Sequence, residues 1–279
     1  MTQTTQQRPA KVRRPQIDLT VTQRLELSPS MVRIVASMSS PELFEDIEPP
    51  EKYVKLVFFD PALELGEHPD FFELKDTLPP EQQPVTRHMT LRHVDLEAGQ
   101  LWIDIALHGD DGHAGPWAAR AQPGDTIVAM GPGGRWVPDP DALWNLFIGD
   151  EAAIPAVMAN IEAMPPQARG EVILEVQDAG HHLELEVPDG WALRWVHRAE
   201  AAEGTHALVE GARTASWPED IDGVQVFAHG EREAMKALRP ILFADHGLER
   251  SQVSLSGYWA AGRDEDVFQA EKRTPVGEV

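Results

Sequence analysis

The sequence predicts two regions of different architecture: an antiparallel β-barrel or sandwich, then an α/β domain with a mostly parallel sheet. Residues 17–130 contain strand-like runs separated by turns rich in proline, glycine and aspartate, whereas strands and helices alternate after about residue 144. A chain of 279 residues is long enough for two domains. The turn-rich Pro138-Asp139-Pro140 marks the boundary, so we predict a mobile basic arm over 1–14 and domains over 15–139 and 140–279.

The first region contains six strand candidates. Residues 17–21 and 54–58 alternate between apolar and polar side chains, as strands with one buried face do. The other four candidates lie at 31–38, 87–94, 101–107 and 125–130. Residues 60–84 are acidic and contain prolines, which predicts a long excursion over the surface between two of these strands.

The second region alternates strands with helices. Its strand candidates are residues 146–149, 171–177, 192–196, 224–229 and 253–256. A helical run follows the first of these strands and ends at Met164, with Asp150 as a candidate N-cap residue. A second helix is predicted over 231–244, where apolar residues recur at the spacing of one helix face. His181 and His182 follow a glycine, which predicts a hairpin turn.

Composition excludes several classes of protein. The formal net charge is −22, a field that repels nucleic acid and anionic membranes, and no apolar run approaches the roughly 18 residues of a membrane span. We therefore expect no nucleic-acid binding and no membrane insertion. The N-terminus lacks the apolar segment of a secretory signal, which predicts a cytoplasmic protein. The acidic chain has one basic segment, the N-terminal arm, which carries Arg8, Lys11, Arg13 and Arg14.

The absence of cysteine limits the redox chemistry that the chain can perform. No disulfide, thiolate nucleophile or cysteine-ligated cluster can form, so electron transfer requires a bound organic cofactor. The 11 histidines show no metal-ligand spacing, and we expect no metal site.

Residues 108–134 form a segment suited to binding a phosphate-bearing ligand. It holds seven of the 21 glycines and three prolines around one short helical run and one strand. Glycine allows close backbone approach, and backbone N–H groups there can bind phosphate oxygens. The preceding strand, 87–92, carries Arg87 and Thr90; an arginine can bind a pyrophosphate bidentately, and a threonine can hydrogen-bond a flavin ring nitrogen. Alternatively, these polar residues lie on an ordinary surface strand.

Three further segments end strands of the predicted parallel sheet, where open α/β sheets bind ligands. They are GDEAAIPA from Gly149, AHGE from Ala228 and SGYW from Ser256. None of them is a G-x-G-x-x-G motif, so their spacing alone does not establish dinucleotide binding. The alternative interpretation is a capped helix start and aromatic packing at the edge of the core.

Together these segments, with the C-terminal SGYW…GRDEDVFQAEKRTPVG, resemble siderophore-interacting proteins. These are FAD-dependent ferric-siderophore reductases within the ferredoxin–NADP reductase superfamily. The resemblance implies a six-stranded antiparallel FAD-binding barrel followed by an NAD(P)H-binding α/β domain. It also implies a reaction in which NADH or NADPH reduces FAD, and FAD reduces the Fe(III) of a bound siderophore to release Fe(II). We expect the protein to act as a monomer.

The resemblance assigns roles to individual residues. The FAD-binding residues it implies are Arg87, Met89, Thr90, His108, Gly109, Gly115, Trp117 and Ala118. Those implied for the nicotinamide nucleotide are Gly149, Asp150, Glu151, Pro155, Gly230, Glu231, Tyr258 and Trp259. Thr90 would tune the flavin ring, while Lys55 and Arg263 would attract the anionic chelate.

Two departures from the family pattern leave alternatives open. Met89 stands where the flavin motif has an aromatic residue, and Ala260-Ala261 follow SGYW where basic residues are frequent. Because of Met89, a non-catalytic siderophore-binding protein is the first alternative. A flavin reductase for another acceptor, such as a quinone or a ferredoxin-linked partner, is the second alternative. The choice between NADH and NADPH stays open, because Arg194 or Arg198 could reach a 2′-phosphate.

Overall fold

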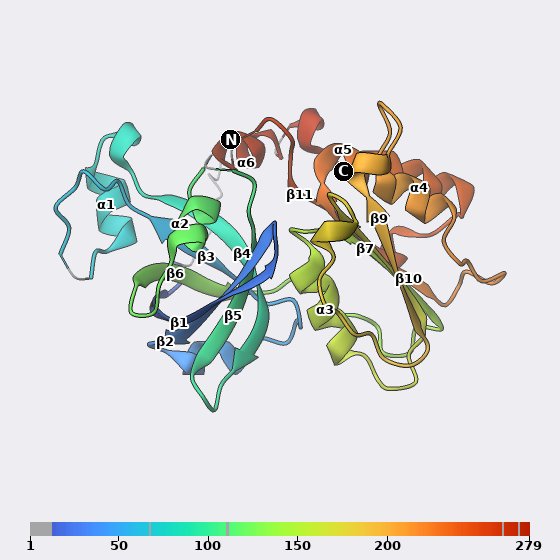
Figure 1. The fold of residues 1–279 in the computed structure, drawn as a ribbon, viewed down its shortest axis with the longest axis horizontal. Helices are drawn as coiled ribbons and strands as arrows, with labels where there is room; N and C mark the ends of the chain where they lie inside the picture. Colours follow the sequence, from blue (N-terminus) through green and yellow to red (C-terminus); the bar gives the residue numbers. More distant parts are fainter. Residues whose placement is uncertain (1–12, 67, 110–111, 264, 273) are drawn as a thin grey trace, which may run out of the picture.

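Six strands close into an antiparallel barrel in the first half of the chain (Figure 1). The computed structural model describes residues 13–66, 68–109, 112–263, 265–272 and 274–279. The barrel strands are β1 (Gln16–Ser28), β2 (Met31–Met38), β3 (Tyr53–Phe58), β4 (Val85–Asp95), β5 (Gln100–Ala106) and β6 (Thr126–Gly133). Their order is β1-β2-β5-β4-β3-β6, and β6 also pairs with β1. The closed barrel decides between the two predicted arrangements, and the sandwich is excluded.

The alternation of side chains along the strands fills the barrel. Ile17, Leu19 and Val21 of β1 point inward and are fully buried with Leu56 of β3 and Ile103 of β5. The intervening polar residues face outward, as the period of two requires. Short helix α2 (Ala114–Arg120) lies between β5 and β6 and contributes buried alanines to the same core.

The excursion between β3 and β4 contains more structure than the sequence predicts. It holds α1 (Phe71–Thr77), whose N-cap Asp70 accepts hydrogen bonds from the N–H groups of Phe72 and Glu73. Phe71 packs against Val57 and Met130 on the outside of the barrel. This apolar contact holds the excursion against the strands.

Five parallel strands form the sheet of the second half, in the order β11-β10-β7-β8-β9. They are β7 (Trp144–Asp150), β8 (Gly170–Val176), β9 (Trp191–His197), β10 (Val224–Glu231) and β11 (Val253–Trp259). Helix α3 (Ile154–Ala163) packs on one face, and α4 (Ala207–Arg213) and α5 (Arg232–Pro240) pack on the other. Because both faces are covered, β8 is buried at every position. The predicted fold class is therefore confirmed.

The connection from β8 to β9 departs from the prediction. β8 and β9 are parallel, so the predicted hairpin at His181 and His182 is wrong. His181 instead ends a short 3₁₀ turn (Ala179–His181), and the following segment carries Leu183 onto the face that α3 covers. This segment is neither helix nor strand, and its apolar residues cover part of the sheet face where a crossover helix would otherwise lie.

The helix boundaries also differ from the sequence reading. Helix α3 begins at Ile154 with Ala153 as its N-cap, so Asp150 does not cap it. Asp150 belongs to the end of β7, and its carboxylate accepts hydrogen bonds from other strand ends. Helix α5 ends at Pro240 and continues as a π-helical turn (Ile241–Asp245).

The two halves touch along α3, β4 and the C-terminal segment. Helix α3 lies between the sheet and the barrel, where Arg92 of β4 pairs with Glu162 of α3 (Figure 1). Helix α6 (Glu265–Glu271) follows β11 and returns to the barrel, where Glu265 is 3.3 Å from His88 Nδ1.

The N-terminal arm and the helices bear on two expectations from the sequence. The predicted basic arm lies outside the described residues except for Arg13 and Arg14, which contact Phe72 and Tyr53 of the barrel region. Within the part of the chain that the structure describes, none of the helices combines the length and apolar character needed to cross a membrane.

Candidate functional site

Three parallel strands end at one buried carboxylate. Asp150 closes β7, and its Oδ2 accepts hydrogen bonds from the Glu231 N–H of β10 at 2.8 Å and from the Trp259 indole N–H of β11 at 2.7 Å. Its Oδ1 accepts from the Ala152 N–H at 3.0 Å. The structure therefore brings together four of the predicted strand-end residues: Asp150, Glu231, Trp259 and Gly230.

Close packing explains the glycines at these strand ends. A Cβ on Gly230 would lie 2.7 Å from Asp150 Oδ2, and its φ of +158° is one that residues with side chains rarely adopt. A Cβ on Gly149 would lie 2.8 Å from the Cβ of Ala153, where α3 approaches the strand. Larger residues at either position would displace the carboxylate or the helix.

Burial gives Asp150 unusual acid–base behaviour. The residue is 1% exposed, and desolvation raises the pKa of its carboxyl to about 7. The nearby charges of Glu151 and Glu175 push in the same direction, while the hydrogen bond from Trp259 opposes them. Trp259 is 37% exposed, so the carboxylate holds an indole ring at the surface of the site.

A hydrogen-bond chain connects the sheet to the barrel. Thr90 of β4 donates to the Tyr258 hydroxyl at the end of β11, and Tyr258 donates to Glu51 Oε2 at 3.2 Å. Glu51 also accepts from the Trp136 N–H at 3.0 Å. Burial raises the pKa values of both Glu51 and Tyr258. The predicted flavin-motif threonine and the SGYW tyrosine therefore lie in one site.

His229 is a buried neutral imidazole that packs against Tyr258, the middle residue of this hydrogen-bond chain. Its Nε2 is 3.0 Å from Ser254 Oγ, and its ring lies 4.8 Å from the Tyr258 ring. Desolvation, with the charges of Lys272 and Arg135, lowers the pKa of His229 to about 3. The imidazole therefore supports the Tyr258 ring by packing and stays uncharged at neutral pH.

On the barrel, Arg87 lies beside the loop that begins α2. The charge of Arg87 contributes to lowering the pKa of His113, the residue before α2, although desolvation is the larger cause. Arg87 Nη1 donates to the Thr86 carbonyl at 2.9 Å and lies 3.9 Å from the exposed Asp266 carboxylate. Gly109 and Gly112 have φ values of +81°, and their backbones face open space.

An aromatic pocket of about 390 Å³ opens beside α2. Its walls include Phe58, His113 and Trp117, and the rings of Phe58 and His113 stack with centroids 5.6 Å apart. Flat walls of this kind accept a planar ring system. Pro116 and Arg120 of α2 complete one side of the pocket.

The remaining predicted residues lie in more varied surroundings. Met89 packs against the barrel core, opposite Val54 on β3, and Ala118 is fully buried in that core. Lys55 lies on β3 between His88 and Met130 of the flanking strands. Arg263 is exposed, and its Nε donates to Glu271 at 2.8 Å. Three others lie near element ends: His108 is exposed after β5, Gly115 is the second residue of α2, and Pro155 is the second residue of α3.

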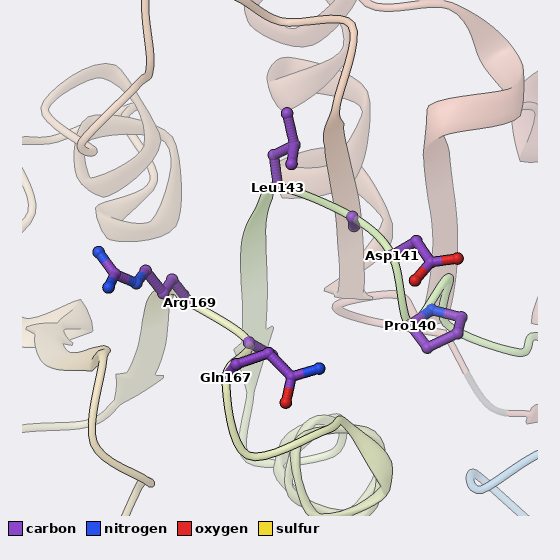
Figure 2. A pocket seen from close by; sticks show the side chains of 7 residues that line it. Pro140, Asp141, Leu143, Gln167 and Arg169 are labelled. Carbon is purple, nitrogen blue, oxygen red and sulfur yellow. The ribbon is translucent and has the colours of Figure 1, made fainter.

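A second pocket lies at the opposite, amino-terminal edge of the sheet. Figure 2 shows Pro140, Asp141 and Leu143 before β7 facing Gln167 and Arg169 before β8 around a hollow of about 290 Å³. Parallel sheets bind ligands at the carboxyl ends of their strands, so this hollow lies away from the site.

Comparison with known proteins identifies the family. A model described as siderophore-interacting FAD-binding domain matches residues 20–136, and one described as siderophore-interacting protein matches 142–262. An uncharacterized protein of Mycobacterium tuberculosis is 42% identical over 260 residues, which cover 88% of this chain and 91% of that protein. This chain belongs to the siderophore-interacting protein family. The resemblance seen in the sequence is thereby confirmed.

Other known proteins match most of this chain. Ferric vibriobactin reductase ViuB of Vibrio cholerae is 32% identical over 202 residues, which cover 71% of this chain and 73% of ViuB. The siderophore-interacting protein SipS of Aeromonas hydrophila superposes with a TM-score of 0.76 at 30% identity, over 94% of this chain and 98% of SipS. A flavohem-like FAD/NAD-binding domain of a Vibrio cholerae nitric oxide dioxygenase shares the fold alone, with a TM-score of 0.64 at 14% identity, over 87% of this chain and 98% of that domain.

The residues of this siderophore-interacting barrel fit an FAD. The guanidinium of Arg87 and the open glycine backbones suit a diphosphate, and the aromatic pocket suits an adenine. Thr90 stands next to Tyr258 where a flavin ring would face the sheet. The donor set and the pocket thus satisfy the chemistry of the cofactor.

Sequence reasoning missed Glu51 and His113. Glu51 follows two prolines in a loop before β3, and no local pattern marks it as a buried partner of Tyr258. His113 lies inside the glycine-rich segment, where its stacking on Phe58 depends on a strand more than 50 residues earlier. Neither contact has a local sequence signal, because both join distant parts of the chain.

Proposed function

We propose that the chain is an FAD-dependent reductase that uses NADH or NADPH to reduce the Fe(III) of a siderophore and release Fe(II). In this proposal, residues 15–139 bind FAD, residues 140–279 bind the nicotinamide nucleotide, and the protein works as a monomer in the cytoplasm. The hydrogen-bond chain from Thr90 through Tyr258 to Glu51 carries the proposal. This chain of hydrogen bonds joins Thr90 of the barrel to the end of β11, which supports a cofactor ring that faces both regions.

Bound FAD would supply the electronic chemistry by accepting a hydride and passing single electrons to two Fe(III) ions. Arg87 would bind its diphosphate, and the pocket beside Trp117 its adenine. Because the Thr90 hydroxyl donates its hydrogen bond to Tyr258, the Thr90 oxygen would face the ring as an acceptor. Tyr258 and Trp259 would exclude water from the ring, with Trp259 held in place by Asp150.

Charge around the site favours a chelate of low negative charge. Arg263 is paired with Glu271, and Ala260-Ala261 occupy the positions after SGYW where basic residues are frequent in the family. A highly anionic chelate would be repelled by a chain of net charge −22 unless cations attract it. We therefore propose a hydroxamate or mixed-type siderophore as substrate, positioned in part by Lys55.

An acceptor comparison tests the proposed function. The FAD-loaded protein is mixed anaerobically with NADH or NADPH and then with a ferric hydroxamate, a ferric tris-catecholate, a quinone or a ferredoxin, and Fe(II) is trapped by a colorimetric chelator. We expect rapid Fe(II) release, fastest from the hydroxamate. Rapid reduction of the quinone or ferredoxin without Fe(II) release would favour a flavin reductase for another acceptor. A protein that takes up no FAD would favour a siderophore-binding role.

A further inference from the structure

The sheet indicates how a dinucleotide would lie, given the nicotinamide donor of the proposed function, on which this inference rests. The chain passes from β7 to β8 and β9 on one side, and then returns to β10 and β11 on the other. The crevice therefore opens between the ends of β7 and β10. If the nicotinamide faces the barrel beside Tyr258 of β11, as the proposed function requires, the adenosine half would extend over the end of β8.

Carboxylates lie near the ends of β7 and β8, and they hold Arg198, which directly follows β9. Arg198 Nη2 donates to Glu151 at 2.6 Å, and Arg198 Nε donates to Glu175 at 3.0 Å. Both carboxylates are largely buried, so the guanidinium balances charges that water cannot reach. A 2′-phosphate approaching Arg198 would compete with Glu151 for the same N–H groups.

The second arginine considered from the sequence does not reach this edge. Arg194 pairs with Ile173 in the middle of the sheet, four residues before Arg198, or roughly 13 Å along a strand. Its three nitrogens donate to Glu171, Thr214 and the Gly211 carbonyl. Both candidate cations for a 2′-phosphate are thus committed elsewhere.

Asp178 provides the opposite kind of recognition directly after β8. Its Oδ1 accepts from the Gly180 N–H at 2.8 Å and interacts with His181 Nδ1 at 2.9 Å, and these bonds lower the pKa of the carboxyl. Among the described residues, none donates a hydrogen bond to Oδ2. An acidic side chain at the end of the second strand accepts hydrogen bonds from the ribose hydroxyls of NAD.

We propose that this site selects NADH over NADPH, with Asp178 as acceptor for the adenosine ribose and the Glu151–Arg198–Glu175 network as the element that rejects a 2′-phosphate. Rejection arises from like charge and from the absence of an uncommitted arginine at this edge among the described residues. The ribose of NADH is accepted by the Asp178 carboxylate, which its own loop already orients through Gly180 and His181.

Calorimetric titration of the FAD-loaded protein with NAD⁺, NADP⁺, 5′-AMP and 2′,5′-ADP tests this selection without turnover. We expect NAD⁺ to bind at least about ten-fold more tightly than NADP⁺, and 5′-AMP more tightly than 2′,5′-ADP. Equal or tighter binding of NADP⁺ and 2′,5′-ADP would overturn this inference and leave the proposed function standing. If neither dinucleotide binds while FAD is retained, the nicotinamide donor of the proposed function fails as well.

Two variants separate acceptance from rejection. Asp178→Asn should weaken NAD⁺ binding by about five-fold and leave NADP⁺ binding nearly unchanged, because only the ribose acceptor is altered. Glu151→Gln should strengthen NADP⁺ binding by about ten-fold, because half of Arg198 is freed. Glu186→Gln, which removes the same charge from an exposed residue, is the control. Unchanged NADP⁺ binding by a Glu151→Gln protein of native circular dichroism, or unchanged NAD⁺ binding by Asp178→Asn, would contradict the inference.

Discussion

The barrel face and the sheet edge are each proposed to bind a nucleotide, yet they present opposite charge. The barrel offers Arg87 beside open glycine backbones, whereas the sheet edge offers Asp150, Glu151 and Glu175. The barrel residues suit a diphosphate that must be held through many turnovers. In the inference above, Glu151 and Glu175 repel a 2′-phosphate, and the nearby Asp178 accepts the ribose hydroxyls of a dinucleotide that must leave. In this proposal the two halves bind their nucleotides by different means, and charge at the sheet edge selects among dinucleotides.

Removing the carboxylate that joins the strand ends should have the largest effect on the sheet side of this comparison. Asp150→Ala leaves the N–H groups of Ala152, Glu231 and Trp259 without their acceptor. We expect the free energy of unfolding to fall by about 3 kcal/mol, measured by urea denaturation. Asp141→Ala, at the exposed opposite end of β7, is the control and should change it by less than about 0.5 kcal/mol.

Removing the arginine should have the largest effect on the barrel side. Arg87→Ala should weaken FAD binding by roughly 30-fold, because a charge-assisted hydrogen bond to a phosphate contributes about 2 kcal/mol. Flavin fluorescence during titration of the apoprotein measures the change. Arg169→Ala at the other edge of the sheet should bind FAD like the wild type. Equal FAD binding by both variants would remove Arg87 from the site.

The buried acid and the buried base make opposite contributions to the pH dependence of stability. The folded chain keeps a proton on Asp150 up to about pH 7, which lowers stability as pH rises from the unfolded pKa of about 4. It keeps His229 uncharged down to about pH 3, which raises stability as pH rises toward about 6.5. The two contributions oppose each other between roughly pH 4 and 6.5.

His229→Phe should uncover the Asp150 contribution. Relative to the wild type, the variant should gain about 1.4 kcal/mol of stability for each pH unit below about 6.5, because no buried imidazole then resists protonation. Denaturation at several pH values measures this slope, which is independent of the constant cost of losing the Ser254 contact. Parallel pH profiles for the two proteins would show that His229 is protonated normally in the fold.

The smallest expected effect concerns the link between the two regions. Tyr258→Phe and Thr90→Val each remove one member of the hydrogen-bond chain and should each lower the free energy of unfolding by about 1 kcal/mol. A double-mutant cycle should give a coupling energy of at least about 0.5 kcal/mol. Strictly additive effects would separate the barrel motif from the sheet.

Strand-end residues were open to prediction from the sequence, whereas the partners that hold them were not. Gly149-Asp150, Gly230-Glu231 and Trp259 each end an apolar run, and parallel strands place such ends at one edge. The prediction that Asp150 caps the following helix was wrong. Its carboxylate accepts hydrogen bonds from Glu231 and Trp259, which are more than 80 residues away.

Contacts between distant loops carry no periodic signal. Glu51 reaches Tyr258 from a loop 207 residues earlier, and its burial depends on the whole barrel. The predicted hairpin at His181 and His182 failed for a related reason, since a turn residue does not reveal the direction of the next strand. Pattern and topology therefore predicted the fold and the strand ends, and only the assembled structure shows the hydrogen-bond chain.

We propose that one flavin site spans the barrel and the sheet and delivers electrons to a ferric siderophore. An anaerobic visible spectrum of the FAD-loaded protein, recorded after NADH and then after a ferric hydroxamate siderophore, tests it most directly. We predict that NADH bleaches the flavin bands and that the chelate restores them with release of about two Fe(II) per flavin, since the two electrons of a hydride leave one at a time. Flavin bands that stay bleached after the ferric siderophore is added would show that the reduced flavin does not pass electrons to the chelate.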